Sequence, residues 1–232
     1  MSSSVAVVIP AYRAARTLAQ VVADARRAAP EAAVLVVDDG SDDATARVAR
    51  AAGAEVLCHP ANLGKGRALA TGLEGALARG AGEIVTCDAD GQHPPASIPA
   101  LLAPVRAGEA DLVVGARRRD PRLMPAGRRA TNWLSSALLS RAVGSSGPDS
   151  QSGFRAMSAA VARDVRPDGR RYEYETEFLF LAAARGFRIA AIGVPTVYDG
   201  APSHFRYGSD SVALAAVFLR HWRSILAGPP PT

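Results

Sequence analysis

Short apolar runs alternate with amphipathic segments along most of the chain. The first run, at residues 5–9, is continuous and rich in β-branched residues, which is typical of a strand buried on both faces. Apolar residues then recur at helical spacing from Leu18 to Ala25, and Thr17 precedes them as the expected helix cap. Similar patterns predict strands at 34–37, 55–58, 83–87, 111–115 and 189–194, and helices at 44–52, 69–78, 97–105, 128–143, 175–185 and 211–226.

This alternation predicts an α/β fold in which a mostly parallel central sheet carries helices on both faces. The 232 residues, 48% of them hydrophobic, are enough for one sizeable core and do not require two independent domains. We expect a main domain at residues 1–208. The apolar helix assigned to 209–227 packs on this domain or on a membrane surface, and residues 228–232 form a disordered tail.

Polar clusters follow three of the predicted strands. In chain order they are Pro10-Ala11-Tyr12, Asp38-Asp39 and Asp88-Ala89-Asp90. Because ligands bind at the carboxyl ends of the strands in parallel sheets, we expect the three clusters to form one site.

The pair Asp88 and Asp90 is the strongest candidate for metal chemistry. Side chains two residues apart on an extended segment point the same way, so both carboxylates can converge on one hard cation. Gln92 could add an amide oxygen, and these ligand types suit Mg²⁺ or Mn²⁺ bound to a diphosphate. An isolated Asp-x-Asp is nevertheless common in loops. His93 is either a further ligand or a structural hydrogen-bonding residue.

Other polar groups have both functional and structural interpretations. Asp38 and Asp39 could bind a nucleobase or ribose, or form an Asx turn or helix cap. The segment 62–67 resembles a phosphate loop but lacks the first Gly and the Ser or Thr after Lys65, so we reject that assignment. Arg117, Arg128 and Arg206 are suited to phosphate, although arginines in such clusters are also often solvated.

Charge and cysteine content indicate which binding partners and which compartment the sequence favours. The net charge of +5 comes mainly from arginine, which suits phosphate groups or an anionic membrane surface, and equally a solubilising surface. Cys58 and Cys87 fall at the ends of apolar runs and show no disulfide or metal spacing. We find no room for a leader before the first strand and no apolar run of about 20 residues. A cytoplasmic protein is expected, with peripheral contact on the inner face of the cell membrane left open.

The motifs together resemble family 2 glycosyltransferases with a GT-A fold, and in particular the dolichyl- or polyprenyl-phosphate mannose and glucose synthases. The matching segments, in order, are residues 8–12 (VIPAY), 37–41 (VDDGS), 62–66 (NLGKG), 88–93 (DADGQH), 115–117 (GAR), 149–155 (DSQSGFR) and 172–177 (YEYETE). The resemblance extends over about residues 5–206.

The resemblance implies a donor site for a GDP- or UDP-sugar and a divalent metal. The residues implied for the nucleotide are Pro10, Ala11, Tyr12, Val37 and Asp39. Those implied for the metal and the diphosphate are Asp88, Ala89, Asp90 and Gln92. Arg117 would face the phosphates, and Arg206, before the last helix, would close over the donor. The family often has an acidic residue soon after Pro-x-Tyr, whereas this chain has Arg13, so the base and the sugar stay open.

The resemblance also implies an acceptor and inverting hexose transfer. Arg128 and Asn132, together with Arg117, are expected to bind a polyprenyl phosphate, which is already an anion at about pH 7 and needs no base. A hydroxyl acceptor, as in cell-surface polysaccharide synthesis, would need a carboxylate base, for which Glu177 is the candidate. The glutamates near it could instead form a solvated helix start.

Other classes of protein stay open at this point. A nucleotidyltransferase should carry a Gly-rich, basic loop after the first strand, which this chain does not supply. A non-catalytic nucleotide-sugar binding module is the second alternative. We expect no nucleic-acid partner, and the sequence does not determine the oligomeric state or the choice between Mg²⁺ and Mn²⁺.

Overall fold

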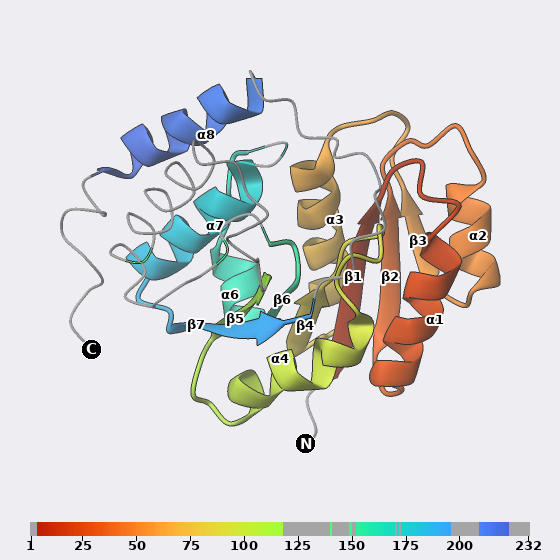
Figure 1. The fold of residues 1–232 in the computed structure, drawn as a ribbon, viewed down its shortest axis with the longest axis horizontal. Helices are drawn as coiled ribbons and strands as arrows, with labels where there is room; N and C mark the ends of the chain where they lie inside the picture. Colours follow the sequence, from red (N-terminus) through yellow and green to blue (C-terminus); the bar gives the residue numbers. More distant parts are fainter. Residues whose placement is uncertain are drawn as a thin grey trace.

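The computed structural model describes residues 4–117, 140, 149, 152–169, 171, 173–195 and 209–222 (Figure 1). Its strands are β1 (Val5–Ala11), β2 (Ala33–Asp38), β3 (Glu55–Cys58), β4 (Glu83–Thr86), β5 (Leu112–Arg117), β6 (Arg155–Ser158) and β7 (Ile189–Val194). Its α-helices are α1 (Leu18–Ala28), α2 (Thr45–Ala51), α3 (Lys65–Ala78), α4 (Ile98–Arg106), α6 (Ala159–Asp164), α7 (Glu173–Ala184) and α8 (Ser209–Arg220). A 3₁₀ turn at Pro95–Ser97 leads into α4.

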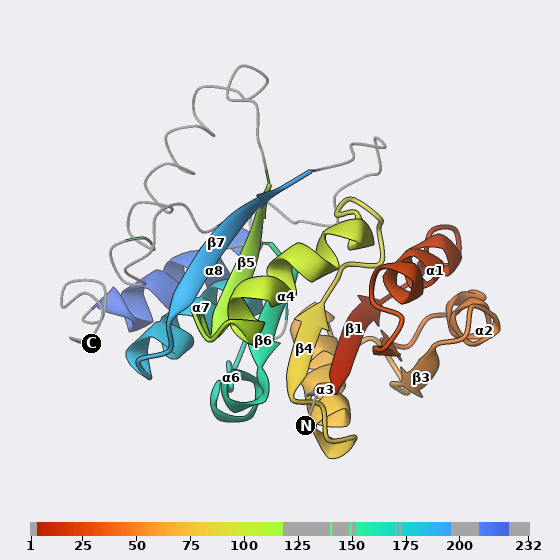
Figure 2. The ribbon, with the colours of Figure 1, turned by 90° about the horizontal axis from the view of Figure 1, so that it is seen from below.

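The strands form one sheet in the order β3-β2-β1-β4-β6-β5-β7. Strands β1 to β4 are mutually parallel, and β5 pairs in parallel with β7. Strand β6 lies between β4 and β5 and runs antiparallel to both (Figure 2). The predicted α/β fold with a mostly parallel sheet is confirmed, but β6 was not predicted, because its four residues follow a polar motif that shows no apolar run.

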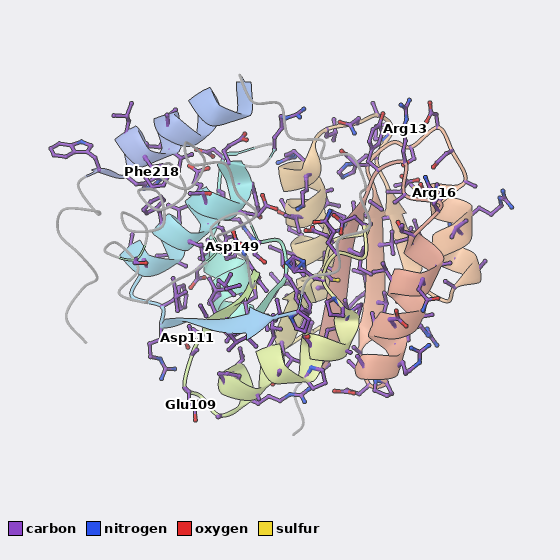
Figure 3. All side chains as sticks on the ribbon, viewed as in Figure 1. Arg13, Arg16, Glu109, Asp111, Asp149 and Phe218 are labelled. Carbon is purple, nitrogen blue, oxygen red and sulfur yellow. The ribbon has the colours of Figure 1, made fainter. Side chains whose placement is uncertain are left out.

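Helices cover both faces of the sheet (Figures 1 and 2). On one face α1 and α4 pack over an apolar cluster that contains Ile9, Val36 and Phe154. On the other face α3, α6 and α7 pack over a cluster that contains Leu73 and Phe178. Helix α8 lies outside α7, where Phe218 contacts Phe180 edge-on at 5.3 Å between ring centres (Figure 3).

The predicted elements before residue 117 are found with small shifts of their ends. Thr17 precedes α1 as expected, but its side chain does not cap the helix; its hydroxyl donates to the carbonyl oxygen of Ala89 at 2.7 Å. Helix α3 begins at Lys65, earlier than the predicted 69. The expected helix at 128–143 and the tail at 228–232 lie outside the described residues. Within the described ranges, no helix is long and apolar enough to cross a bilayer.

Helix α3 packs closely on β1 through a glycine. A Cβ atom at Gly72 would overlap Val8 Cγ1 and would lie 3.1 Å from Val37 Cγ2. Both valines belong to buried strands, and β-branched side chains have little freedom to turn aside. One turn further on, a Cβ at Gly75 would meet the tips of Leu57 and Leu35, which are more flexible.

These two glycines give a matched test of the packing. We expect Gly72→Ala to destabilise the protein by about 1–3 kcal/mol, because overpacking outweighs the better helix propensity of alanine. Gly75→Ala should change the free energy of unfolding by less than about 1 kcal/mol. Urea unfolding of both variants measures the difference. Equal stabilities would contradict the close contact between α3 and β1.

Candidate active site

The three polar clusters meet at the carboxyl edge of the sheet. Pro10 and Ala11 are in register with Val37 and Asp38 across the β1–β2 pair. The backbone N–H of Asp39 donates to the Ala11 carbonyl oxygen at 2.8 Å. The hydrogen bond from Thr17 to Ala89 joins the segment after β1 to the turn after β4. The clusters therefore lie side by side, as their places after parallel strands predict.

Asp39 fixes the loop that leads into α3. Its carboxylate accepts hydrogen bonds from the backbone N–H groups of Leu63 at 2.9 Å and Gly64 at 2.8 Å. Its Oδ1 also lies 2.7 Å from His59 Nδ1, and the other ring nitrogen of His59 lies 3.0 Å from Thr71 Oγ1. The side chain of Asp39 is thus almost fully buried and organises the edge beside the expected nucleotide.

Asp38 has a local structural role. Its Oδ1 accepts a hydrogen bond from the backbone N–H of Ser41 at 3.1 Å, which is an Asx-type turn. Ser41 Oγ in turn accepts from the N–H of Arg13, whose φ of 51° lies in the left-handed region. The Arg13 guanidinium pairs with Asp42 at 2.7 Å and lies over the Tyr12 ring. Arg13 therefore braces the loop after β2 against the loop after β1.

The Lys65 ammonium lies between two carboxylates. Its Nζ is 2.7 Å from Asp88 Oδ1 and 2.7 Å from Glu175 Oε1. The three residues come from the first residue of α3, the segment after β4 and the first turn of α7. Burial lowers the pKa of Lys65, but the charges of Asp88 and Glu175 outweigh it, and its pKa lies above the ordinary value. Lys65 therefore stays positively charged.

Asp90 stands at the outer end of the turn. Its Oδ1 accepts a hydrogen bond from the backbone N–H of Gln92 at 2.9 Å. Asp90 is exposed as a residue, but partial desolvation of its carboxyl group and the charge of Asp88 raise its pKa. Burial likewise raises the pKa of Glu175, which is 1% exposed, although Lys65 acts in the opposite direction. The protein by itself therefore does not fully stabilise the negative charges of Asp90 and Glu175.

The segment before β6 passes close to Asp88. A Cβ atom at Gly153 would lie 2.5 Å from Asp88 Oδ1 and 2.7 Å from its Oδ2, so a larger residue here would have to displace this carboxylate. The Gly153 carbonyl oxygen accepts a hydrogen bond from Thr86 Oγ1 at 2.6 Å. Next to it, Ser152 Oγ lies 3.3 Å from His93 Nε2, and His93 meets the Phe154 ring edge-on. These contacts favour the structural interpretation of His93.

Glu177 has other partners than Lys65 and Asp88. Its Oε2 accepts hydrogen bonds from the backbone N–H groups of Asp168 at 3.0 Å and Gly169 at 2.9 Å, and its Oε1 pairs with Arg220 at 2.8 Å. Two residues on a helix point to nearly opposite sides, so Glu175 and not Glu177 meets Lys65. Both carboxylates are buried, and the expectation of a solvated helix start is wrong for them.

The donor set fits a divalent cation that is shared with a ligand. Among the described residues, no group of three His, Cys, Asp or Glu side chains converges as a complete metal cage. Asp88 and Asp90 supply two carboxylates on one turn, and Gln92 follows with an amide. Mg²⁺ is usually bound in this way, by one or two carboxylates together with substrate phosphates and water.

The remaining predicted residues are placed only in part. The backbone of Arg117 ends β5 at the same sheet edge, while Arg128, Asn132 and Arg206 lie outside the described residues. Four residues were not predicted as parts of the site: Thr17, Lys65, Gly153 and Glu175. Lys65 and Gly153 both stand in the motifs singled out from the sequence, but only the fold shows which carboxylate each one meets.

Comparison with known proteins identifies the family and the fold. Residues 6–166 match the family described as Glycosyl transferase family 2. The chain is 33% identical over 201 residues to undecaprenyl-phosphate mannosyltransferase of Micrococcus luteus, covering 82% of each chain. It is 30% identical over 213 residues to UDP-N-acetylglucosamine–dolichyl-phosphate N-acetylglucosaminyltransferase of Methanococcus voltae, covering 82% of this chain and 84% of the relative. Glucosyl-3-phosphoglycerate synthase of Mycobacterium tuberculosis, solved with Mn²⁺, UDP and glucosyl-3-phosphoglycerate, superposes with a TM-score of 0.69 at 23% identity, covering 99% and 82% of the two chains. The GT-A fold is thereby confirmed.

The raised pKa values give a testable signature of the site. The pKa values of Asp90 and Glu175 are higher in the folded state than the ordinary carboxyl value. The folded state therefore binds protons more tightly than the unfolded state, and it loses stability as the pH rises from the ordinary carboxyl pKa through the raised values. We therefore expect Asp90→Asn to raise the melting temperature at neutral pH without metal. The gain should be at most about 2–4 °C, because solvent screens an exposed carboxylate.

Divalent metal should reverse the order of stability. With UDP or GDP present, Mn²⁺ at about 100 times its dissociation constant stabilises a binding protein by about 2.7 kcal/mol. The wild type should gain this stability and Asp90→Asn should lose most of it, as thermal unfolding with and without Mn²⁺ would show. An equal response of the two proteins would refute Asp90 as a ligand.

Proposed function

Since the chain belongs to glycosyl transferase family 2, we propose that this glycosyltransferase moves a hexose from a nucleotide-diphosphate sugar to a polyprenyl phosphate. The hexose is of the mannose or glucose type, the donor is a GDP- or UDP-sugar, and transfer inverts the anomeric carbon. The observation that carries the proposal is the Asp88-Ala89-Asp90 turn beside the ends of β1 and β2. Relatives named for undecaprenyl- and dolichyl-phosphate acceptors support the choice of acceptor.

The residues after β1 and β2 form the donor end of the proposed site. Tyr12 is 40% exposed and can contact a nucleotide, whereas Pro10, Ala11 and Val37 shape the edge through their backbone. Asp39 is occupied with Leu63 and Gly64, so its part is to hold the wall of the nucleotide site in place. Arg206 is assigned to closure over the donor by the resemblance alone.

Asp88, Asp90 and Gln92 would hold the Mg²⁺ or Mn²⁺ at the other end of the donor. When bound, such a metal neutralises the charge that develops on the departing diphosphate. The protein keeps the two carboxylates close together before the donor arrives, through Lys65, Gly153 and the turn at Gln92. Preorganisation of this kind stabilises the transition state without reorganisation during the reaction.

The glutamates of α7 favour an acceptor that is already ionised. Attack by a hydroxyl needs a group that takes its proton, whereas a phosphate oxygen does not. Glu175 is paired with Lys65, and Glu177 is held by Asp168, Gly169 and Arg220, so neither carboxylate stands ready as a base. A polyprenyl phosphate therefore fits better than a hydroxyl acceptor.

Arginines complete the proposed acceptor site. We assign Arg117, Arg128 and Asn132 to the acceptor phosphate on the resemblance. Strand β5 ends at Arg117, on the edge of the sheet where β4 leads to Asp88. Bidentate guanidinium groups suit a phosphate at this place.

Helix α8 is the proposed contact with the membrane. Leu219, in the last turn of α8, is 73% exposed, and Trp222, two residues beyond the end of the helix, is 51% exposed. The net charge of +5 favours an anionic lipid surface. The proposal places the enzyme on the cytoplasmic face of the cell membrane, where a dissolved donor can meet a lipid acceptor.

A transfer assay tests the function. With Mn²⁺ or Mg²⁺ and a panel of GDP- and UDP-hexoses, the purified protein should glycosylate polyprenyl phosphate and leave hydroxyl acceptors unmodified. Asp90→Asn should lower kcat/KM by more than about 100-fold, because replacing a metal ligand should cost more than the roughly 10- to 100-fold that is typical of residues that only support the ligands. Asp111→Asn, at the opposite edge of the sheet (Figure 3), is the matched control and should keep activity. Transfer to hydroxyl acceptors alone would refute the lipid-phosphate acceptor.

A second assay tests the membrane contact. The double variant Leu219→Gln/Trp222→Gln should sediment less with vesicles that contain phosphatidylglycerol, by about tenfold if the two side chains contribute about 1.4 kcal/mol together. Its transfer to a short, water-soluble prenyl phosphate should match that of the wild type. Unchanged vesicle binding would show that another surface meets the lipid.

A further inference from the structure

Lys65 is the only lysine in the chain; the other members of the 27 lysines and arginines are arginines. This lysine occupies the place between Asp88 and Glu175, with 2.7 Å to each carboxylate. A compact ammonium group can donate in two directions at such a point, whereas a planar guanidinium needs more room and a forked partner. The shape of the group, as well as its charge, therefore matters here.

The start of α3 is fixed so that Lys65 reaches this place. Asp39 holds the backbone N–H groups of Leu63 and Gly64, and Gly64 has a φ of 98°, in the left-handed region that favours glycine. Lys65 is the next residue and the first of the helix. Its ammonium is thus delivered to Asp88 from a loop anchored on the neighbouring strand.

Asp88 is held from two directions. Gly153 limits it on the side of β6, where even a methyl group would collide with both carboxylate oxygens. Lys65 contacts Oδ1 of Asp88 from the side of α3, and Lys65 is itself paired with Glu175 of α7. Glu175 is buried, and its Oε2 has no hydrogen-bond partner among the described residues, so the lysine is its main compensation.

We propose that Lys65 and Glu175 are positioning residues that orient Asp88 for the divalent cation without contacting the cation themselves. This inference rests on the proposed function, because it takes Asp88 as a metal ligand. Outer-shell partners of this kind typically change metal affinity by about 10- to 100-fold when they are removed.

Two simpler roles make different predictions for the affinity of Mn²⁺. If Lys65 acted only through its positive charge, Lys65→Met would leave a more negative site, and Mn²⁺ would bind more tightly. If Lys65 and Glu175 only stabilised the fold, replacing both by neutral residues would restore stability and affinity together, since a buried pair can often be replaced without loss. A positioning role predicts weaker binding in both variants.

The test compares Lys65→Met, Glu175→Gln and the double variant with the wild type. Electron paramagnetic resonance titrations measure the dissociation constant of Mn²⁺ in the presence of UDP or GDP, and thermal unfolding measures stability. The double variant removes one positive and one negative charge, so the net charge around Asp88 does not change. We expect its melting temperature to be higher than that of Lys65→Met, while its Mn²⁺ dissociation constant stays raised by about tenfold or more.

A matched control uses the other glutamate of α7. Arg220→Met breaks the contact with Glu177 and should leave the Mn²⁺ dissociation constant within about twofold of the wild type, because the ion pair of Arg220 with Glu177 involves neither Lys65 nor Asp88. Wild-type affinity for Mn²⁺ in the double variant, or tighter Mn²⁺ binding in Lys65→Met, would overturn this inference but leave the proposed function standing. Failure of the wild type to bind Mn²⁺ would overturn the metal assignment of the proposed function and this inference with it.

Discussion

One arrangement of charges holds the candidate site together: the Lys65 ammonium between the carboxylates of Asp88 and Glu175. Two carboxylates removed from water repel each other and lose hydration, at an effective cost of several kcal/mol for each ion. A single cation at hydrogen-bonding distance from both offsets this cost. The three residues come from α3, from the segment after β4 and from α7, so the ion pairs also join parts of the chain that are far apart in sequence.

The antiparallel strand β6 makes this meeting possible. It lies between β4 and β5, and Gly153 just before it leaves the space that Asp88 occupies. After β6 the chain continues into α6 and α7 on the same face as α3, which brings Glu175 towards Lys65. The edge of the sheet that carries Asp39 is therefore linked to α7 through buried polar contacts. The carboxylates of Asp88 and Asp90 lie on one turn before any cation is bound. This arrangement lowers the stability of the fold, and it suits a site for a cation.

Much of the fold could be predicted, because buried strands such as β1 and amphipathic helices such as α1 leave clear patterns in the sequence. The common edge of the polar clusters followed from the parallel order of the strands. Strand β6 could not be predicted, since a four-residue strand with a polar start gives too short a pattern. From the sequence we singled out Glu177 and not Glu175, because which glutamate meets Lys65 depends on how α7 is rotated towards it. The partner of Lys65 depends on long-range contacts that no local spacing encodes.

Selective ¹⁵N labelling of lysine offers the most direct measurement of whether the metal binds beside this group of charges. Because the chain has a single lysine, the side-chain spectrum should contain one ammonium signal, from Lys65. With UDP or GDP present, diamagnetic Mg²⁺ should shift this signal, and paramagnetic Mn²⁺ should broaden it strongly. A Lys65 signal that stays sharp and unshifted at saturating Mn²⁺ would contradict a metal site at Asp88 and Asp90.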